Sequence, residues 1–380
     1  MDNRRRQRIL LSLFFFLAGI CFASWASRIP TIKAYFGLND AQLGTILLFM
    51  PISSLLGLPV SGWLVSRFES RYPMTVGFVF IALSLFMIGV ATSEVVLIAA
   101  ISVFAFSTRI MSIALNTQAI QLQKRYERKI NGSFHGLWST GGILGVGVST
   151  IFVAFDVSMV LHFAIISGMT LLVTLATFSK LDSNDRAISG NRIAFAKPDP
   201  YIVYLGLLVF LAAVCEGGMF DWSGIYFRET VGVELFTLGY LLFMILMAFS
   251  RFVSDGLVEQ FGMARIYMMS GSLVCLGIGM AVAIPTFWPS LIGFCLVGFG
   301  CASVVPMTFS LAGHSKKYSP GMAISIIATY SIVGMLIGPP VIGYIAHALS
   351  LRVAFLVFAL AGLLMLPISH LLFRLIRKTA

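Results

Sequence analysis

The sequence predicts an all-α membrane protein whose 12 transmembrane helices form two pseudo-symmetric six-helix bundles. Its composition is the first reason: 58% of the 380 residues are hydrophobic and only 11% are charged, whereas a soluble domain carries about 25% charged residues. Apolar segments of roughly 20 residues, long enough to cross ~30 Å of hydrocarbon, recur along the whole chain. The second half also repeats the pattern of the first. These three observations exclude a water-soluble fold.

Twelve apolar segments can be placed along the chain in order. They lie near residues 9–27, 41–66, 73–92, 95–122, 133–154, 158–179, 201–227, 236–257, 265–285, 288–312, 320–347 and 352–374. The one long polar stretch, from Lys180 to Asp199, joins the sixth segment to the seventh. We therefore predict an N-terminal bundle over 1–179, a cytoplasmic linker over 180–200 and a C-terminal bundle over 201–380. No other connection is long enough for a separate folded domain.

The internal repeat relates residues about 193 positions apart, close to half of the 380 residues. The first-half motifs are Gly62-x-Leu64-x-Ser66-Arg67-Phe68 and Gly141-x-x-x-Gly145, and their counterparts are Asp255-x-Leu257-x-Glu259-Gln260-Phe261 and Gly334-x-x-x-Gly338. Repeated halves are typical of secondary transporters, which bind their substrate between the halves near the middle of the membrane. Prolines inside the spans (Pro51, Pro59, Pro306, Pro339 and Pro340) predict bends, either as ordinary kinks or beside a cavity.

Lysine and arginine residues fall on alternating sides of the predicted spans. Of the 26, 21 collect at one side, Arg251 among them, 4 lie on the other side, and Arg109 alone is in mid-span. Because basic residues mark the cytoplasmic side, we expect both termini in the cytoplasm of a multi-pass cell inner (plasma) membrane protein. The net charge of +11 then reflects orientation in the membrane and not nucleic-acid binding. The arginines before the first apolar run precede ~18 apolar residues, which predicts an uncleaved span.

No catalytic, cofactor or metal motif is present in the sequence. All five cysteines lie inside apolar segments without paired spacing, which favours small core residues over a disulfide or a metal site. There is no Gly-x-x-x-x-Gly-Lys-Ser/Thr run for ATP binding and no nucleophile elbow. We therefore expect no enzymatic activity and no cofactor. The expected partners are a small-molecule substrate, the lipid bilayer and protons, since an ion gradient remains as the energy source, and we expect a monomer.

Ionisable residues deep inside the predicted spans are the strongest candidates for function, because charges in hydrocarbon are costly. Glu216 lies about 15 residues into the seventh span, and Asp221 follows ~7.5 Å further along that helix. A buried carboxyl group favours its protonated form, so both residues are candidates for proton coupling. A static hydrogen bond to a neighbouring helix is the alternative for Glu216. Arg109 is a candidate for binding an anionic or polyhydroxylated substrate, and a static ion pair is its alternative.

Other polar and aromatic residues extend these candidates. Asn116, followed by Gln118 and Gln121, continues a polar stripe along the fourth span, and Asn116 is expected to line a cavity. Trp25 and Trp222 are candidates for stacking on sugar rings, although tryptophan is also typical of the membrane interface. His135 lies at the inner end of the fifth span as a possible relay or as a structural residue.

The chain resembles the major facilitator superfamily over nearly its full length, and within it the fucose-permease-like branch that includes the YbjJ-type inner-membrane proteins. In the first half the resemblance rests on Trp25-Ala-Ser-Arg-Ile-Pro30, Gly37-Leu38 with Leu43-Gly44, and Phe134-His135-x-x-Trp138-Ser139 with Gly141-Gly142. In the second half it rests on Glu216-Gly217-x-x-x-Asp221-Trp222-Ser223-x-x-Tyr226, Leu238-Gly239-Tyr240, and Gly338-Pro339-Pro340 with Gly343. It implies that spans one, four, seven and ten line a central cavity with Trp25, Arg109, Asn116, Glu216, Trp222 and Tyr226 as candidates.

Some positions depart from the family pattern. The superfamily usually has an acid where Ser66 stands and a glycine where Glu69 stands, and the branch often has an aspartate where Ser112 stands. The loss of that aspartate leaves the predicted proton coupling to Glu216 and Asp221. The candidates for the inner gate are Arg67, Arg71, His135, Arg251, Asp255 and Arg265.

Three functions follow from these features. The resemblance and the paired acids favour a proton-coupled symporter that moves a small polar solute, a sugar or sugar-like compound, by alternating access. Proton-driven efflux of amphipathic compounds is the alternative, but such antiporters usually carry a Gly-Pro motif in span five. Here Gly338-Pro339-Pro340 is in span eleven, which favours import. A membrane sensor that transports nothing is the third possibility.

Overall fold

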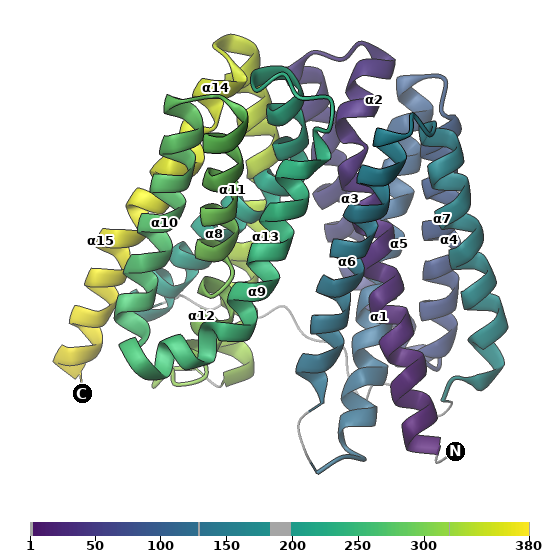
Figure 1. The fold of residues 1–380 in the computed structure, drawn as a ribbon. Coiled ribbons are helices and arrows are strands. Elements are labelled where there is room, and N and C mark those ends of the chain that lie inside the picture. The colour runs from purple at the N-terminus through teal and green to yellow at the C-terminus, as the bar shows by residue number, and fades with distance from the viewer. Residues whose placement is uncertain (1–2, 128–129, 183–198, 319, 380) are drawn as a thin grey trace. The chain divides into compact units, whose positions relative to one another are not determined.

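The computed structural model describes residues 3–127, 130–182, 199–318 and 320–379, so most of the predicted linker lies outside the described residues. In the first half the helices are α1 (Asn3–Ser27), α2 (Ile29–Phe36), α3 (Asp40–Arg67), α4 (Arg71–Val90), α5 (Glu94–Gln123), α6 (Asn131–Ala154), α7 (Met159–Thr177) and the short η1 (Phe178–Lys180) (Figure 1). In the second half they are α8 (Pro200–Ile225), η2 (Tyr226–Thr230), α9 (Thr237–Phe261), α10 (Met263–Ala283), α11 (Phe287–Cys301), α12 (Val304–Ala312), α13 (Pro320–Ala348), α14 (Leu351–Ala354) and α15 (Leu356–Thr379). The described residues contain 12 helical segments long and apolar enough to cross a membrane, which confirms the predicted fold class.

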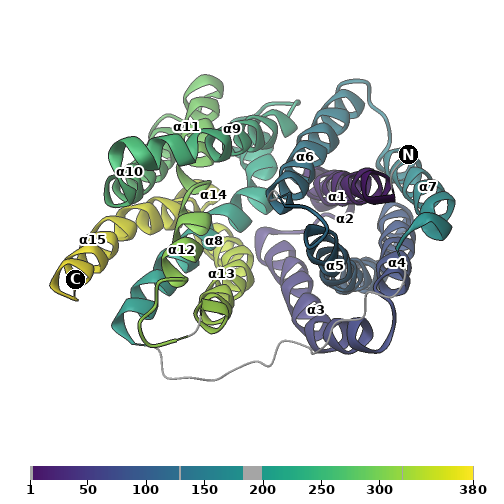
Figure 2. The same cartoon turned by 90° about the horizontal axis from the view of Figure 1, so that it is seen from below.

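The chain separates into two compact units. Unit 1 consists of residues 1–37 and 49–192, and unit 2 consists of residues 38–48 and 193–380. The start of α3 is therefore counted with unit 2. In unit 1, α1 lies at the centre and contacts α4, α5, α6 and α7 (Figure 2). In unit 2, α8 has the same central place, in contact with α9, α11, α12, α13 and α15. The first helix of each repeat is thus the central helix of its unit.

The glycine pairs of the internal repeat pack against these two central helices. A Cβ added at Gly141 of α6 would overlap the carbonyl oxygen of Phe16 in α1. The counterpart Gly334 of α13 lies just as close to α8, because an added Cβ would sit 2.6 Å from the carbonyl oxygen of Phe210. Small residues allow such close approach of membrane helices. The repeat seen in the sequence therefore corresponds to one packing contact that occurs in both units.

Two spans are interrupted where the sequence places a proline nearby. The first span is divided at Arg28, and Pro30 then stands in the first turn of α2. The tenth span is divided between Cys301 and Val304, and Pro306 lies in the first turn of α12. Proline is tolerated at a helix start because the first N–H groups have no intrahelical acceptor. Pro51 and Pro59 of α3, by contrast, lie within a helix that continues past them.

A buried arginine joins the interruption of the first span to the start of α7. Arg28 is 4% exposed, its Nε donates to Nδ1 of His162 at 3.1 Å, and its NH2 donates to the carbonyl oxygen of Val157 at 2.9 Å. Because Nδ1 accepts a hydrogen bond, the His162 ring is neutral with its proton on Nε2. His162 is completely buried. The pair therefore fixes the C-terminal end of α1 to α7.

We expect His162→Leu to destabilise the protein by about 2–3 kcal/mol, because a buried charged donor loses its acceptor. His162→Asn is the matched control, since its side-chain oxygen can take the place of Nδ1. Thermal unfolding of the purified variants in detergent measures the difference. Equal melting temperatures for the two variants would contradict the structural role of this hydrogen bond.

Candidate functional site

The central feature of unit 2 is an ion pair between α8 and α9. NH2 of Arg251 donates to Oε1 of Glu216 at 3.1 Å. Glu216 is 8% exposed, whereas a third of the Arg251 side chain, 34%, remains accessible. Arg251 was expected at the cytoplasmic end of its span, among the gate residues. It lies in α9, three residues before the end of the candidate span Thr237–Ser254, and supplies the charge that opposes Glu216. Its role in a gate stays a prediction. The position in the chain could not reveal this contact, because it depends on how α8 and α9 pack.

A second acidic residue lies on the same helix as Glu216. Asp221 is half-buried, and no hydrogen bond of its side chain is found among the described residues. The Tyr240 ring of α9 is 1% exposed, within electrostatic reach of both carboxyl groups. Its hydroxyl has no hydrogen-bond partner among the described residues. Unit 2 therefore contains two carboxyl groups, one guanidinium group and one phenol hydroxyl in neighbouring positions of α8 and α9.

The two glycines after Glu216 have different surroundings. Gly217 has no close neighbour, since an added Cβ would lie 3.5 Å from Met335. At Gly218 the space for a Cβ is occupied by the ring of Phe358. Gly218 therefore leaves no room for water or substrate beside Glu216, because the ring of Phe358 in α15 packs there against α8.

Arg109, the ionisable site candidate of unit 1, lies on α5. Nε of Arg109 donates to the hydroxyl oxygen of Ser54 in α3 at 2.8 Å, and the Arg109 side chain packs against Gly57 of the same helix. Asn116, two turns later, donates from Nδ2 to the carbonyl oxygen of Ser112 at 2.8 Å. Both Arg109 and Asn116 are half-buried. Arg109 therefore has a neutral hydrogen-bond partner, and its binding of a substrate stays a prediction.

The three aromatic candidates lie in the interior of their own units. Trp25, Trp222 and Tyr226 are 1%, 0% and 0% exposed. The Tyr226 hydroxyl donates to the carbonyl oxygen of Ala281 at 2.8 Å, and its ring centroid is 4.3 Å from that of Phe355. These contacts give Tyr226 a packing role. Binding of substrate by any of the three stays a prediction.

The gate candidates other than Arg251 lie in several environments. Arg71 pairs with Glu69 at 2.8 Å, so the glutamate that departs from the family pattern has a partner in this chain. Arg67 and Arg265 are exposed. His135 is also exposed and its ring meets the edge of Phe15 at 5.5 Å. The side chain of Asp255 lies outside the described residues.

Sequence reasoning missed several residues that the structure places at these sites. Ser54 carries no charge, and nothing in the local sequence distinguished it from other polar residues of membrane helices. Tyr240 was noted only as part of the Leu238-Gly239-Tyr240 motif. Glu69 was noted only as a departure from a pattern. The pairing of Arg28 with His162 was signalled by two ionisable residues in apolar surroundings, but their separation of 134 positions concealed the contact.

Comparisons with known proteins identify the family. A model of the Major Facilitator Superfamily matches residues 11–319 and 257–380. An uncharacterised MFS-type transporter of Yersinia pestis is 33% identical over 354 residues, which cover 92% of this chain and 91% of that protein. Membrane protein MosC of Rhizobium meliloti is 30% identical over 353 residues, which cover 92% of this chain and 86% of that protein.

Solved structures share the fold. The crystal structure of the nucleoside transporter NupG is similar with a TM-score of 0.80 at 14% identity, covering 98% of this chain and 99% of that one. A bacterial homologue of the human lysosomal transporter Spinster, in an inward-facing and unoccupied conformation, gives a TM-score of 0.76 at 14% identity, covering 98% of both chains. The predicted superfamily and its helical membrane fold are thus confirmed. The chain belongs to the major facilitator superfamily, and it is a multi-pass membrane transporter.

Proposed function

We propose that this transporter imports a small polar solute, a sugar or a sugar-like compound, together with protons, by alternating access across the plasma membrane. The observation that carries the proposal is the Glu216–Arg251 pair inside unit 2. An ionised Glu216 is held by the guanidinium group at 3.1 Å. A proton on the carboxyl group removes its charge and weakens this interaction.

The side chain of Arg109 supports the proposal that the substrate is polar. Its guanidinium group presents several N–H donors, and among the described residues Nε donates to the Ser54 hydroxyl at 2.8 Å. Such a group suits the hydroxyl or anionic groups of a sugar-like solute. The NupG neighbour is a nucleoside transporter, so nucleosides, which contain a sugar, belong in the panel of test solutes. At 14% identity that neighbour supports the fold and adds no residue role.

The direct experiment combines a binding screen with a transport assay. Thermal shifts of the purified protein with sugars, nucleosides, organic acids and amphipathic drugs select the solute. Its uptake into proteoliposomes is then measured with an imposed proton gradient, with and without an uncoupler. We expect accumulation that disappears when the gradient is collapsed. Uptake that is unchanged by the uncoupler would refute proton coupling.

The two alternative functions, efflux and sensing, predict different results in experiments of this kind. Proton-driven efflux predicts that a deletion strain becomes sensitive to a broad set of amphipathic drugs, whereas import of a polar solute predicts no such change. A sensor predicts no flux in proteoliposomes for any solute that shifts the melting temperature. It also predicts that Arg109→Ala and Glu216→Ala leave the cellular phenotype unchanged.

We expect Arg109→Gln to lower solute uptake at subsaturating concentration by about tenfold or more. Hydrogen bonds to charged groups contribute ~1.5–3 kcal/mol and 1.4 kcal/mol corresponds to tenfold in affinity. Ser54→Ala keeps the charge of Arg109 and removes only its partner, so its effect is expected to be smaller. Initial uptake rates of the two variants measure this. A larger loss in Ser54→Ala than in Arg109→Gln would contradict a direct role of Arg109 in substrate binding.

A further inference from the structure

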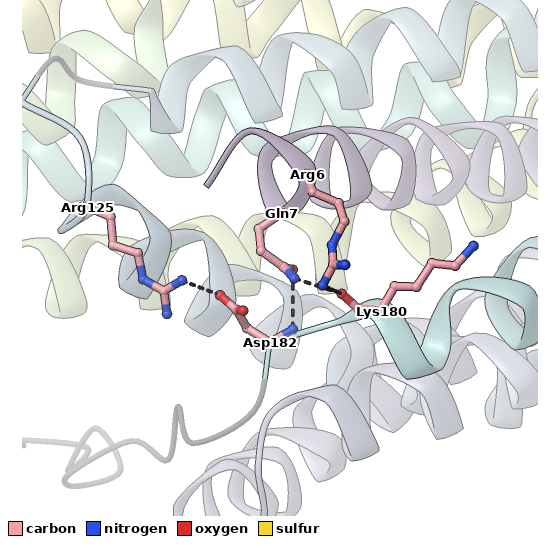
Figure 3. Close-up of polar contacts among 5 residues, drawn as sticks. All are labelled: Arg6, Gln7, Arg125, Lys180 and Asp182. Atoms are coloured by element: carbon pink, nitrogen blue, oxygen red, sulfur yellow. Dashed lines mark hydrogen bonds and ion pairs between the residues drawn. The ribbon is translucent and has the colours of Figure 1, made fainter. Parts of the chain in front are cut away.

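A cluster of polar contacts lies in unit 1 where α1 begins, where α5 ends and where the chain leaves η1 (Figure 3). Its members are Arg6, Gln7, Arg125, Lys180 and Asp182. None of these residues belongs to the proposed transport site. Lys180 and Asp182 stand at the end of the described part of unit 1, where the connection to unit 2 starts. The contacts therefore act on the first residues of the connector.

Gln7 holds the connector through the main chain. Its Nε2 donates to the carbonyl oxygen of Lys180 at 2.7 Å, and its Oε1 accepts from the backbone N–H of Asp182 at 3.2 Å. Figure 3 shows the amide facing both backbone groups. Gln7 is 2% exposed, so these two hydrogen bonds replace water contacts that the buried amide has lost. A single side chain thus joins α1 to a segment 173 to 175 positions later.

Arg125 holds the same segment from α5. Its NH1 donates to Oδ2 of Asp182 at 2.6 Å, and Arg6 adds a longer contact of 3.4 Å to the carbonyl oxygen of Lys180. The Arg125 side chain is 41% exposed, and exposed ion pairs contribute little on their own. The buried Gln7 amide is therefore the main element, and Arg125 orients the Asp182 side chain beside it.

A buried amide without a protein partner lies next to these contacts. Gln118 of α5 is 3% exposed, and neither Oε1 nor Nε2 has a hydrogen-bond partner among the described residues. Gln118 lines a small cavity together with Gln7, Gln121, Arg125 and Asp182. The cavity volume is about 10 Å³, which is room for one water molecule. Leu11 and Leu122 complete the cavity wall, and the amide, guanidinium and carboxylate groups beside them provide the donors and acceptors that a bound water needs.

We propose that Gln7, Arg125 and Gln118 form a clamp that fixes residues Lys180 to Asp182 to unit 1, and that Gln118 takes part through one water molecule bound in the cavity. Water is the ligand because it can accept from the Gln118 amide nitrogen and donate to the amide or carboxylate oxygens. The clamp makes the start of the connector a part of unit 1.

The direction in which Gln118→Leu shifts the melting temperature tests the water site. Gln118→Leu removes the amide at nearly constant volume. If a water molecule joins this amide to the clamp, the variant loses those hydrogen bonds and melts at a lower temperature. If the amide is dry and unpaired, leucine removes a buried unsatisfied group and raises the melting temperature. A melting temperature of Gln118→Leu above that of the wild type would overturn the water site.

Hydrogen exchange of the full-length protein in nanodiscs tests the clamp itself. The N–H of Asp182 is protected by Gln7 Oε1 at 3.2 Å, and loss of one such bond speeds exchange by about fivefold. We expect this acceleration in Gln7→Ala and in Gln118→Leu, at Asp182 and not in peptides of α4. Arg6→Gln, which alters only the longer contact, is the control and should exchange like wild type. Unchanged exchange at Asp182 in Gln7→Ala would overturn the clamp, whether or not the protein transports protons.

Discussion

Glu216→Gln is expected to abolish proton-driven accumulation of the solute while solute exchange across the membrane continues. Glutamine keeps the size and one carbonyl oxygen of the side chain, so it can still accept from Arg251, but it cannot take up a proton. At one proton per solute, a pH difference of one unit drives about tenfold accumulation, because it corresponds to ~1.4 kcal/mol. The wild type should reach this ratio. The variant should stop near equal concentrations inside and outside.

Two assays on the same proteoliposomes separate coupling from binding. Accumulation under a pH gradient reports coupling, and counterflow of labelled solute without a gradient reports binding and translocation. Asp221→Asn distinguishes the two acidic candidates, because Asp221 has no hydrogen-bond partner among the described residues and Glu216 has Arg251. We expect accumulation to survive better in Asp221→Asn than in Glu216→Gln. Wild-type accumulation in Glu216→Gln would remove the residue from the proton path.

Gly141→Ala is expected to prevent stable folding of unit 1. The added methyl group would overlap the carbonyl oxygen of Phe16, and a backbone atom of a central helix cannot move aside as a flexible side chain can. Overpacking of this kind costs 1–3 kcal/mol and occasionally more, and α1 and α6 would have to separate along their whole contact. The yield of monodisperse protein on size-exclusion chromatography measures the effect.

The same helix provides the control for this prediction. Gly147 lies in α6 with nothing within 4 Å of an added Cβ, so Gly147→Ala should be neutral or slightly stabilising, because alanine favours a helix by about 1 kcal/mol over glycine. The two substitutions are chemically identical and differ only in what faces them. Equal yields from both would mean that α1 and α6 do not approach as closely as the structure indicates.

The regular recurrence of apolar segments and the internal repeat of the sequence predicted most of the fold. Runs of about 20 apolar residues report the bilayer thickness directly, and the repeat from Gly141 to Gly334 indicated a contact that recurs in both units. Pro306 likewise predicted a bend in the tenth span, which is divided just before it, between Cys301 and Val304. Such features depend on the local sequence and on the membrane, so they can be predicted from a single sequence.

The candidate site was predictable only in part, because its contacts depend on packing. Glu216 was predicted from the cost of a charge in hydrocarbon, but its partner was not. An arginine side chain reaches several ångströms from its backbone, so the position of Arg251 in the chain does not show that it pairs with Glu216 on the neighbouring helix. Gln7 and Asp182 are 175 positions apart, and no periodic pattern connects them.

Infrared difference spectroscopy on the reconstituted protein tests directly whether Glu216 takes up the transported proton. Spectra are recorded on acidification, with and without the solute, for the wild type and for Glu216→Gln. We expect the wild type to lose a carboxylate band and to gain a protonated carboxyl band on acidification. Both changes should be missing in Glu216→Gln. Identical difference spectra for the two proteins, with proton-driven accumulation intact, would contradict this expectation.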